Sequence, residues 1–173
     1  MAHEAFRFRD MNENDVEECV RLYRQMVDHH REIYQDDTIP YADDTLRTKL
    51  KRTDQNYIKI VAEENRRIVG LLTVEIKGRT CVLDEILVAK DKRGKGIGTV
   101  FADYAKKTGR ERGCTELQVS FAARNVRALN FYHKMGLNCL GMIQLFMPLT
   151  EKGREQWYKR GKTTRFLGYK YYY

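Results

Sequence analysis

Residues 93–98 have the sequence Arg-Gly-Lys-Gly-Ile-Gly and lie between an apolar run and a segment of helical periodicity. Glycines at alternate positions carry no side chains, so the backbone can approach a ligand closely there. The first turn of a helix offers unpaired N–H groups and the positive end of the helix dipole. Lys92, Arg93 and Lys95 add positive charge. Together these features predict a binding site for a phosphate or a pyrophosphate.

The glycines alone are also consistent with a tight turn and close helix packing, because short glycine motifs often match by chance. Two other nucleotide-binding motifs do not fit this segment. The chain has no G-x-x-x-x-G-K-[ST], and Thr99 stands where the dinucleotide fingerprint needs its third glycine. The sequence therefore argues against both of those classes.

A second segment, residues 125–137, has the sequence Asn-Val-Arg-Ala-Leu-Asn-Phe-Tyr-His-Lys-Met-Gly-Leu. Ala128, Phe131 and Tyr132 fall on one face of a predicted helix, at positions i, i+3 and i+4. Packing in the core accounts for Phe131. Tyr132 fits core packing as well, but its phenol can also donate a proton to a leaving group.

The two segments resemble the two signatures of the GNAT superfamily of N-acetyltransferases. Arg93, Gly96 and Gly98 match Arg/Gln-x-x-Gly-x-Gly/Ala, and residues 125–137 match N-x-x-A-x-x-F-Y-x-x-x-G-F except for Leu137 at the last position. The resemblance implies an α/β fold of the GNAT type, with helices on both faces of a mixed sheet of about six to seven strands. It also implies an acyltransferase that moves an acetyl group from acetyl-CoA to a primary amine.

The resemblance further implies which residues contact the donor. In the family, backbone N–H groups of the glycine turn hold the pyrophosphate, and the end of the preceding strand pairs with the pantetheine arm. Asn125 would hydrogen-bond that arm. Tyr132 would be the general acid, because the departing thiolate has a conjugate thiol with a pKa of roughly 8.5 and a nearby phenol can protonate it. The implied contacts of acetyl-CoA are Leu87, Val88, Arg93, Gly94, Lys95, Gly96, Ile97, Gly98, Thr99, Asn125 and Ala128.

Asp84 and Glu85 are the candidates for a general base. A lysine-like amine has a pKa near roughly 10.4 and arrives protonated, so some group must accept a proton. Both carboxylates lie in a strand that is otherwise apolar, where an unpaired charge is costly. Strand alternation predicts that they point to opposite faces, so that one of them faces the amine. Structural ion pairs with basic residues on the covering helices, or a base that acts through water, stay open as alternatives.

Four further carboxylates, Asp36, Asp37, Asp43 and Asp44, concentrate negative charge between the first two predicted helices. In GNAT folds this region borders the acceptor entrance, so the resemblance suggests a cationic acceptor: a polyamine, a lysine side chain or a protein N-terminus. Some GNAT enzymes that act on small diamines also carry an acidic pair like that of residues 84 and 85. A solvated loop whose carboxylates cap helices is an equally open interpretation.

Hydrophobic periodicity predicts the elements that position these groups. We expect strands at 6–9, 57–62, 68–76, 81–89, 117–121 and 139–149, and helices at 12–34, 44–52, 99–112 and 125–135. The strand at 81–89 is apolar on both faces, as a central strand is. The helix at 99–112 forms a crossover that requires parallel pairing, and the hairpin before it makes the sheet mixed. We expect one GNAT domain over residues 1–149 and a basic, aromatic extension over 150–173.

The composition suits a single globular domain. The chain has 173 residues, of which 42% are hydrophobic and 32% charged. No apolar run reaches the roughly 18 residues that span a bilayer, and the N-terminus has no signal-peptide pattern, so we expect a cytoplasmic protein without membrane contact. The four cysteines are scattered singly and no histidine has partners at zinc-like spacing. We therefore expect no metal and no cysteine that carries an acyl group.

The C-terminal extension mixes aromatic and basic residues. Residues 156–173 hold five basic residues and no acidic one, and so supply +5 of the net charge of +8. The residues concerned are Trp157, Tyr158, Lys159, Arg160, Lys162, Arg165, Phe166, Tyr169, Lys170, Tyr171, Tyr172 and Tyr173. Such mixing can bind nucleic acid. We favour an arm that packs on its own domain or on a second subunit, as in a homodimer, because aromatics at this density are usually covered.

Three functions remain in competition. The leading one is an acetyl-CoA-dependent N-acetyltransferase in which the amine attacks directly within a ternary complex. The first alternative is a non-catalytic acyl-CoA sensor of the same fold, although the presence of Tyr132 favours an enzyme. The second is a nucleic-acid-binding protein that uses the basic extension. The sequence does not identify the acceptor, because one fold serves many substrates.

Overall fold

The computed structural model describes residues 6–159, 163–166 and 168–172. The chain divides into two compact units. The first, here called the sheet unit, comprises Met1–Val27 and Pro40–Ser120, and the second, the C-terminal unit, comprises Asp28–Ile39 and Phe121–Tyr173. No helix within the described residues has the length and apolar character needed to cross a membrane.

The sheet unit contains a five-stranded mixed sheet in the order β1-β2-β3-β4-β5. Its strands are β1 (Arg7–Asp10), β2 (Tyr57–Glu64), β3 (Arg67–Lys77), β4 (Thr80–Val88) and β5 (Glu116–Val119). The first four strands pair antiparallel in chain order, whereas β5 pairs parallel with β4. A parallel neighbour needs a crossover, which the helix between β4 and β5 supplies. The predicted hairpin, mixed sheet and crossover are thus confirmed.

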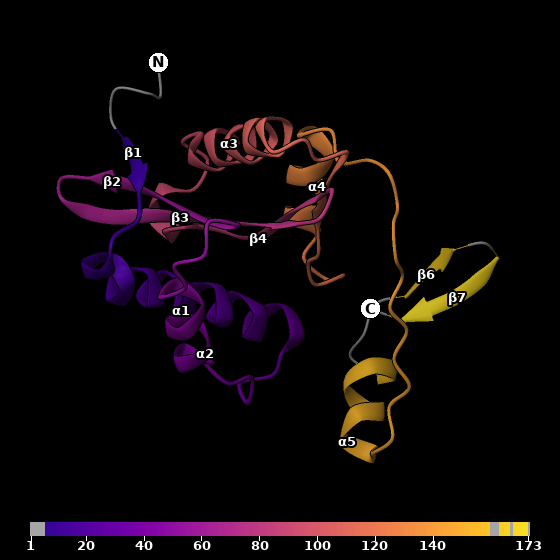
Figure 1. Ribbon diagram of the computed structural model, residues 1–173. Coiled ribbons are helices and arrows are strands. Elements are labelled where there is room, and N and C mark those ends of the chain that lie inside the picture. The colour runs from indigo at the N-terminus through magenta and orange to yellow at the C-terminus, as the bar shows by residue number, and fades with distance from the viewer. Residues whose placement is uncertain (1–5, 160–162, 167, 173) are drawn as a thin grey trace. The chain divides into compact units, whose positions relative to one another are not determined.

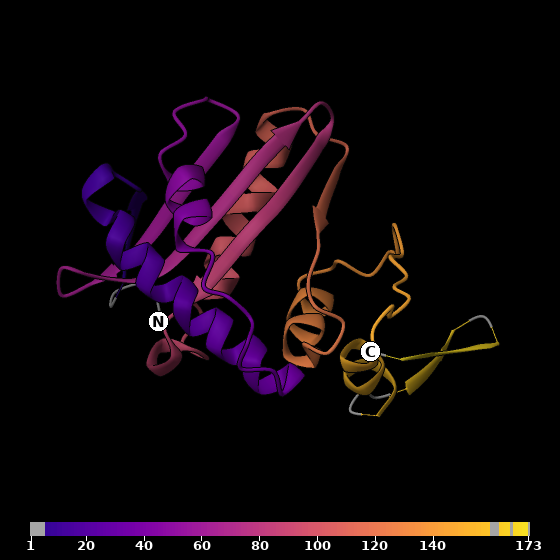
Figure 2. The same cartoon turned by 90° about the horizontal axis from the view of Figure 1, so that it is seen from below.

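Helices cover both faces of this sheet (Figure 1). Within the sheet unit, the part of α1 (Val16–Tyr34) up to Val27 and α2 (Asp43–Leu50) cover one face, and α3 (Ile97–Glu111) covers the other, as the view from below also shows (Figure 2). α3 lies close to the strands, because a Cβ atom at Gly70 of β3 would come within 2.9 Å of the Phe101 ring. Phe101 is fully buried and marks the core on this side.

The C-terminal unit begins with α4 (Val126–Lys134), which matches the predicted helix within one residue at each end. After it come α5 (Glu151–Arg154), a π-helical turn (Glu155–Lys159), and a hairpin of β6 (Thr163–Phe166) and β7 (Tyr169–Tyr172). The described residues therefore contain seven strands, in two sheets rather than one. Of the extension predicted from the sequence, Arg160, Lys162 and Tyr173 lie outside the described residues.

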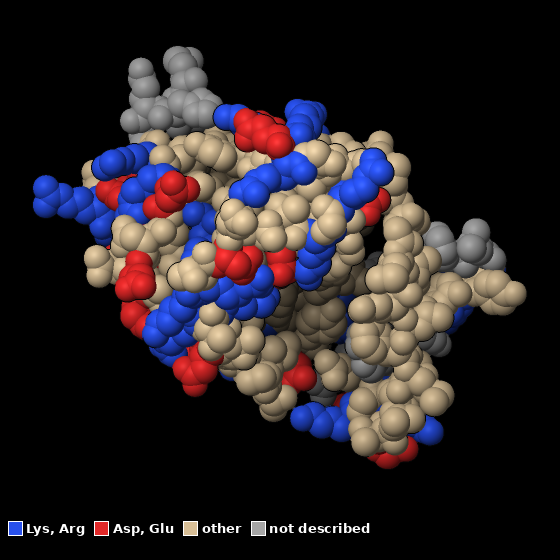
Figure 3. Space-filling model, in the orientation of Figure 1, with Lys and Arg blue, Asp and Glu red and all other residues tan. Residues whose placement is uncertain are grey.

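The predicted strand at 139–149 is wrong, because this segment forms neither strand nor helix. Its large apolar side chains are exposed by 57–89%; they are Leu140, Met142, Ile143, Leu145, Phe146, Met147 and Leu149. Figure 3 shows the stretch that runs down from α4 as largely free of charged residues. A β-prone sequence becomes a strand only when a neighbouring strand pairs with it, and no described strand does so here.

Candidate functional site

The turn after β4 owes its shape to two glycines. A short 3₁₀ segment, η2 (Lys90–Lys92), follows the strand and leads into the turn. Gly94 and Gly96 have φ values of 80° and 88°, a conformation that L side chains rarely adopt. Nothing lies within 4 Å of the place that a Cβ atom would take at Gly94. Backbone conformation, and not crowding, is therefore what requires glycine at residue 94, and the positive φ favours glycine at residue 96 in the same way.

The N-terminus of α3 has no side-chain cap. Gly96 is its N-cap residue, and the first intrahelical bond runs from the Val100 N–H to the Gly96 carbonyl at 3.1 Å. The N–H groups of Ile97, Gly98 and Thr99 precede that bond and have no helical acceptor. An anion placed against this turn can accept these N–H groups and interact with the helix dipole.

The basic residues of the turn differ in what they contact. The Arg93 Nε donates to the carbonyl of Val88 at 3.1 Å, so its side chain folds back onto the end of β4. Lys92 forms an ion pair with Glu64. Lys95 is exposed beside the turn. Arg93 and Lys92 thus hold the turn against the strands, and Lys95 is the basic side chain that extends into solvent.

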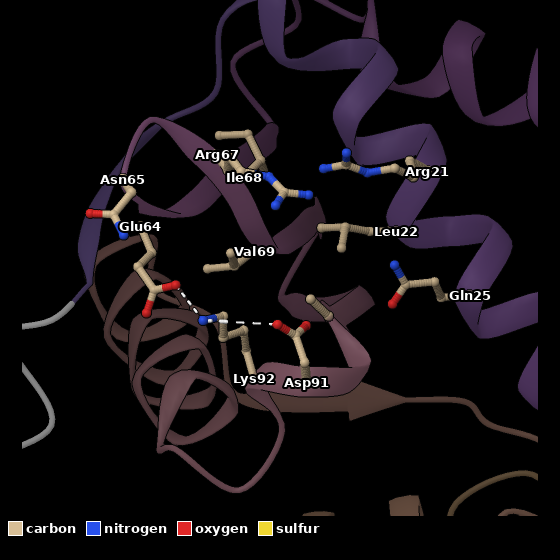
Figure 4. Close-up of a pocket in the computed structure, with 11 residues that line it drawn as sticks. Arg21, Leu22, Gln25, Glu64, Asn65, Arg67, Ile68, Val69, Asp91 and Lys92 are labelled. Atoms are coloured by element: carbon tan, nitrogen blue, oxygen red, sulfur yellow. Dashed lines mark ion pairs between the residues drawn. The ribbon is translucent and has the colours of Figure 1, made fainter.

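A pocket of about 370 Å³ lies behind this turn, on the side of α1 (Figure 4). Arg21 and Gln25 of α1 line one side, the β2–β3 hairpin lines another, and η2 closes the pocket. Gln25 accepts a hydrogen bond from the Lys90 N–H at 3.0 Å, and the Lys92–Glu64 pair joins η2 to the hairpin. The lining includes neither the turn glycines nor the acidic residues of β4. Its contacts therefore brace the segment that precedes the turn.

One edge of β4 is open near the turn. β5 pairs with β4 only from Thr80 to Leu83, the latter opposite Val119. Residues 85–88 pair with β3 on one side, and no described strand pairs with residues 84–88 on the other. An extended ligand can form main-chain hydrogen bonds along such an edge. Leu87 and Val88, which the sequence assigned to the pantetheine arm, lie on this open stretch.

A β-bulge changes the direction of the acidic pair in β4. Thr73 of β3 pairs with Glu85, and the next residue, Val74, pairs with Leu83, so Asp84 is the extra residue. Such an insertion interrupts the alternation of side chains along a strand. The prediction that Asp84 and Glu85 face opposite sides is therefore wrong. Both carboxylates lie on the face covered by α1 and α2, where they interact with the same lysine of α2.

Asp84 is fully engaged by neighbouring groups. Its two oxygens lie 3.1 and 3.0 Å from Lys49 Nζ, and its Oδ2 also accepts a hydrogen bond from the Tyr57 hydroxyl at 2.8 Å. Tyr57 is buried, and the Arg52 guanidinium stacks over its ring at 4.2 Å. The structural ion pair that the sequence left open is therefore present at Asp84.

Glu85 has a different environment. Within the described part of the chain its carboxylate forms no hydrogen bond and no ion pair. Burial, and to a smaller extent the charge of Asp84, raises the pKa of Glu85 to about 7, although Lys49 opposes the shift. Burial and the nearby charge of Glu85 also raise the pKa of Tyr23. Glu85 is thus a partly buried carboxyl group that can exchange a proton near neutral pH.

The carboxylates of the first turn of α2 have structural partners. Asp43 accepts from Arg24 of α1, with Nε at 2.9 Å, and Asp44 accepts from Arg47 at 3.0 Å. Acidic residues in a first helical turn also interact favourably with the helix dipole. Neither residue caps α2, whose N-cap is Ala42, so arginine pairing and the helix dipole account for both. In the C-terminal unit, Asp36 accepts from the Thr38 N–H at 3.0 Å.

The second predicted segment lies in the C-terminal unit. Asn125 is the N-cap of α4, and its side-chain oxygen accepts from the Ala128 N–H at 3.0 Å. The sequence assigned Asn125 to the coenzyme but missed this capping role, which asparagine before a helical run could have indicated. Tyr132 is 9% exposed, and its ring centroid lies 5.4 Å from that of Phe121 and 5.1 Å from that of Phe131. Its ring is therefore held by aromatic packing.

Known proteins share this chain's sequence pattern and fold. The Acetyltransferase (GNAT) family matches residues 20–137. The thialysine N-epsilon-acetyltransferase of Bos taurus is 24% identical over 141 residues, which cover 74% of this chain and 81% of the relative. The enzyme of that name from Mus musculus is 22% identical over 143 residues, which cover 75% of this chain and 82% of the relative.

Solved structures agree on the fold. One is an aminoglycoside acetyltransferase from an uncultured soil metagenomic sample, in complex with trehalose. It has a TM-score of 0.62 and 19% sequence identity, and the match covers 87% of this chain and 100% of the solved chain. Another is the PaiA N-acetyltransferase of Thermoplasma acidophilum, in complex with coenzyme A. It has a TM-score of 0.63 and 16% sequence identity, and the match covers 75% of this chain and 87% of the solved chain.

Proposed function

The chain belongs to the GNAT acetyltransferase family and is an acyltransferase, and from this premise we propose that it acetylates a primary amine with acetyl-CoA as the donor. The observation that carries the proposal is the arrangement of β4. Among the described residues, the strand has an open edge at 84–88 and presents the Glu85 carboxylate without an ion-pair partner, and it ends in the glycine turn before α3. One strand thus joins a site for an extended, anionic donor to a group that can accept a proton.

Acetyl-CoA fits the groups at the end of β4. The uncapped N–H groups of Ile97, Gly98 and Thr99 suit its pyrophosphate, and Lys95 adds positive charge. The open edge at Leu87 and Val88 suits the amides of its pantetheine arm. The coenzyme A named in the structure of the PaiA enzyme supports the same donor. In the C-terminal unit, Asn125 and Ala128 are assigned to the donor by family resemblance.

The reaction that we propose needs three proton transfers: two from the acceptor nitrogen, before and after it attacks, and one to the departing sulfur. Glu85 accepts a proton from the acceptor's ammonium group, and the neutral nitrogen then attacks the thioester carbonyl carbon. The new C–N bond forms, the nitrogen releases its second proton to water, the C–S bond breaks, and the thiolate of coenzyme A leaves. Tyr132 donates its phenolic proton to that sulfur. The role of Tyr132 rests on the match of its segment to the family signature.

The two buried cysteines, Cys19 and Cys81, are unsuited to carry an acyl group, which favours direct attack. Burial raises the pKa of Cys19 to about 12 and that of Cys81 to about 11, so neither thiol forms an appreciable thiolate at neutral pH. Cys81 lies against Gly109 of α3, where no acyl group would fit. Initial-rate plots at several acetyl-CoA concentrations should therefore intersect, as they do for a ternary complex. Parallel lines would indicate a covalent acyl-enzyme instead.

The acceptor that we propose is a cationic amine. A carboxylate with no partner among the described residues, on the strand that leads to the donor site, attracts an ammonium group and can then take its proton. Similar proteins are named as acetyltransferases of thialysine and of aminoglycosides, and these names support an acceptor of this kind. The carboxylates of α2 support it less, because Asp43 and Asp44 already have arginine partners.

A screen for thiol release tests the proposal. The protein is incubated with acetyl-CoA and, in separate reactions, polyamines, free amino acids, aminoglycosides or peptides with free N-termini. We expect thiol release above the amine-free blank with at least one cationic class. If coenzyme A binds and every class stays at the blank, the chain is a sensor of acyl-CoA and not an acetyltransferase.

A glycine substitution tests the donor site. Gly96→Ala forces a side chain into a left-handed conformation, so the free energy of unfolding should fall by about 1–2 kcal/mol. Distortion of the α3 N-terminus should also raise the Kd for acetyl-CoA roughly tenfold or more. Calorimetry measures both quantities. Gly78→Ala is the matched control, because Gly78 also has a positive φ, 60°, and lies in the turn at the other end of β4. An equal Kd for the two variants would contradict the assignment.

A further inference from the structure

Lys49 and the acidic pair of β4 form a cluster in which the charges are unevenly matched. Lys49 Nζ contacts both carboxylate oxygens of Asp84, at 3.1 and 3.0 Å, and Tyr57 donates to one of them. Glu85, the next residue, receives no such partner among the described residues. The side chain of Lys49 is 39% exposed and that of Asp84 is 23% exposed, so solvent and small molecules can reach the pair.

Because Lys49 pairs with Asp84 and not with Glu85, the cluster can accept only limited additional positive charge. The charges of Lys49 and Asp84 cancel, so ionised Glu85 is the uncompensated charge of the three. A single ammonium group matches it. A second ammonium group on the same acceptor would need Asp84, which is already occupied, and it would approach the positive charge of Lys49. The cluster is therefore suited to one cationic group and unsuited to two.

We propose that Lys49 determines the charge selectivity of the acceptor site: it reserves the acidic pair for amines that bring one positive charge, and disfavours α,ω-diamines. This inference rests on the proposed function, because it requires that the acceptor amine enters at Glu85. Lys49 acts through Asp84, and so it is a specificity-determining residue and not a catalytic one. Its removal should change the ranking of acceptors more than the rate of acetyl transfer.

The substitution Lys49→Met tests this inference, because methionine keeps an unbranched apolar chain and removes the charge. The two probes are n-butylamine and 1,4-diaminobutane, which have the same carbon chain and differ in the second ammonium group. We expect the KM for 1,4-diaminobutane to fall roughly 5- to 10-fold, and the KM for n-butylamine to change less than about twofold. Because Lys49 lowers the pKa of Glu85, its loss should shift the pH profile of kcat upward, by the same amount for both amines. If one probe is not acetylated, its Ki against an acceptor that is acetylated supplies the same comparison.

Two controls and one substitute variant separate charge selectivity from other effects. Lys51→Met removes the same charge from an exposed site at the C-cap of α2. It should leave the ratio of the two KM values unchanged. Lys49→Arg keeps the charge and should keep the wild-type ratio. Lys49→Gln replaces the methionine variant if melting curves show that the latter does not fold.

The outcomes are distinguishable. A folded Lys49→Met protein whose KM ratio equals that of the wild type would overturn the inference, and so would an equal shift for both amines. If the wild-type protein releases no thiol from acetyl-CoA with any amine, the proposed function fails instead.

Discussion

The substitution Tyr132→Phe should lower kcat by roughly 100-fold or more while the Kd for coenzyme A stays the same. The variant loses only the phenolic oxygen, and the ring can keep its packing against Phe121 and Phe131. Without a proton donor, the thiolate must leave with its full charge, which raises the barrier to C–S cleavage. Stopped assays of thiol release give kcat, and calorimetric titration gives the Kd.

Tyr104→Phe is the matched control for this prediction. Tyr104 lies on α3 with its ring 6.4 Å from that of Phe8 and is 37% exposed, so removal of its hydroxyl should leave kcat unchanged. A Tyr132→Phe enzyme with wild-type kcat would exclude Tyr132 as the general acid. A fall in kcat together with a weaker Kd would point to a role in donor binding.

The substitution Glu85→Gln should also lower kcat by about 100-fold, because glutamine cannot accept a proton from the ammonium group. In the wild-type protein the pKa of Glu85 is about 7, so kcat should rise as pH increases through 7 and level off above it. The variant should lose that rise. Glu75→Gln is the control, because Glu75 is a strand carboxylate already paired with Arg52 and Lys77. A variant that retains the wild-type kcat and pH profile would favour a base that acts through water.

Stability provides an independent check on Glu85. Its folded-state pKa, about 7, lies above the ordinary value of 4.5, so the folded protein binds this proton more tightly than the unfolded chain does. The corresponding stability is present below pH 4.5 and is lost as the pH rises to about 7. Because glutamine does not ionise, the Glu85→Gln variant should not lose stability over this pH range. The melting temperature of the variant relative to the wild type should therefore be higher at pH 8 than at pH 5.

The glycine turn and its helix could be predicted well from the sequence. Gly94 and Gly96 mark a backbone conformation that few other residues adopt, and the helix that follows has a clear apolar face. These signals are local and depend little on tertiary context. The same holds for α4, whose cap and apolar face lie within a dozen residues.

The direction of Asp84 and Glu85 could not be predicted in this way. Alternation along β4 sends the two carboxylates to opposite faces, and the pairing of Thr73 with Glu85 reverses that expectation. A bulge depends on how two strands align, and the sequence of either strand alone does not encode the alignment. The partner of Asp84 is equally non-local, because Lys49 lies 35 residues earlier in the chain.

The prediction for residues 139–149 also failed because it depended on strand pairing. Their apolar character predicts a strand, but a strand exists only if another one pairs with it. The hairpin of β6 and β7, in contrast, forms between neighbouring segments and was not expected from the basic and aromatic composition of the extension. Composition indicated the unusual character of this region but not its elements.

Acetyl transfer itself is the most direct test of the account. The protein is incubated with acetyl-CoA and the best acceptor of the amine screen, and both the N-acetylated amine and free coenzyme A are quantified over time. We predict that the two products form in equal amounts, only when protein, donor and amine are all present. Binding of coenzyme A without any N-acetylated amine would contradict the central claim that this chain is an amine acetyltransferase.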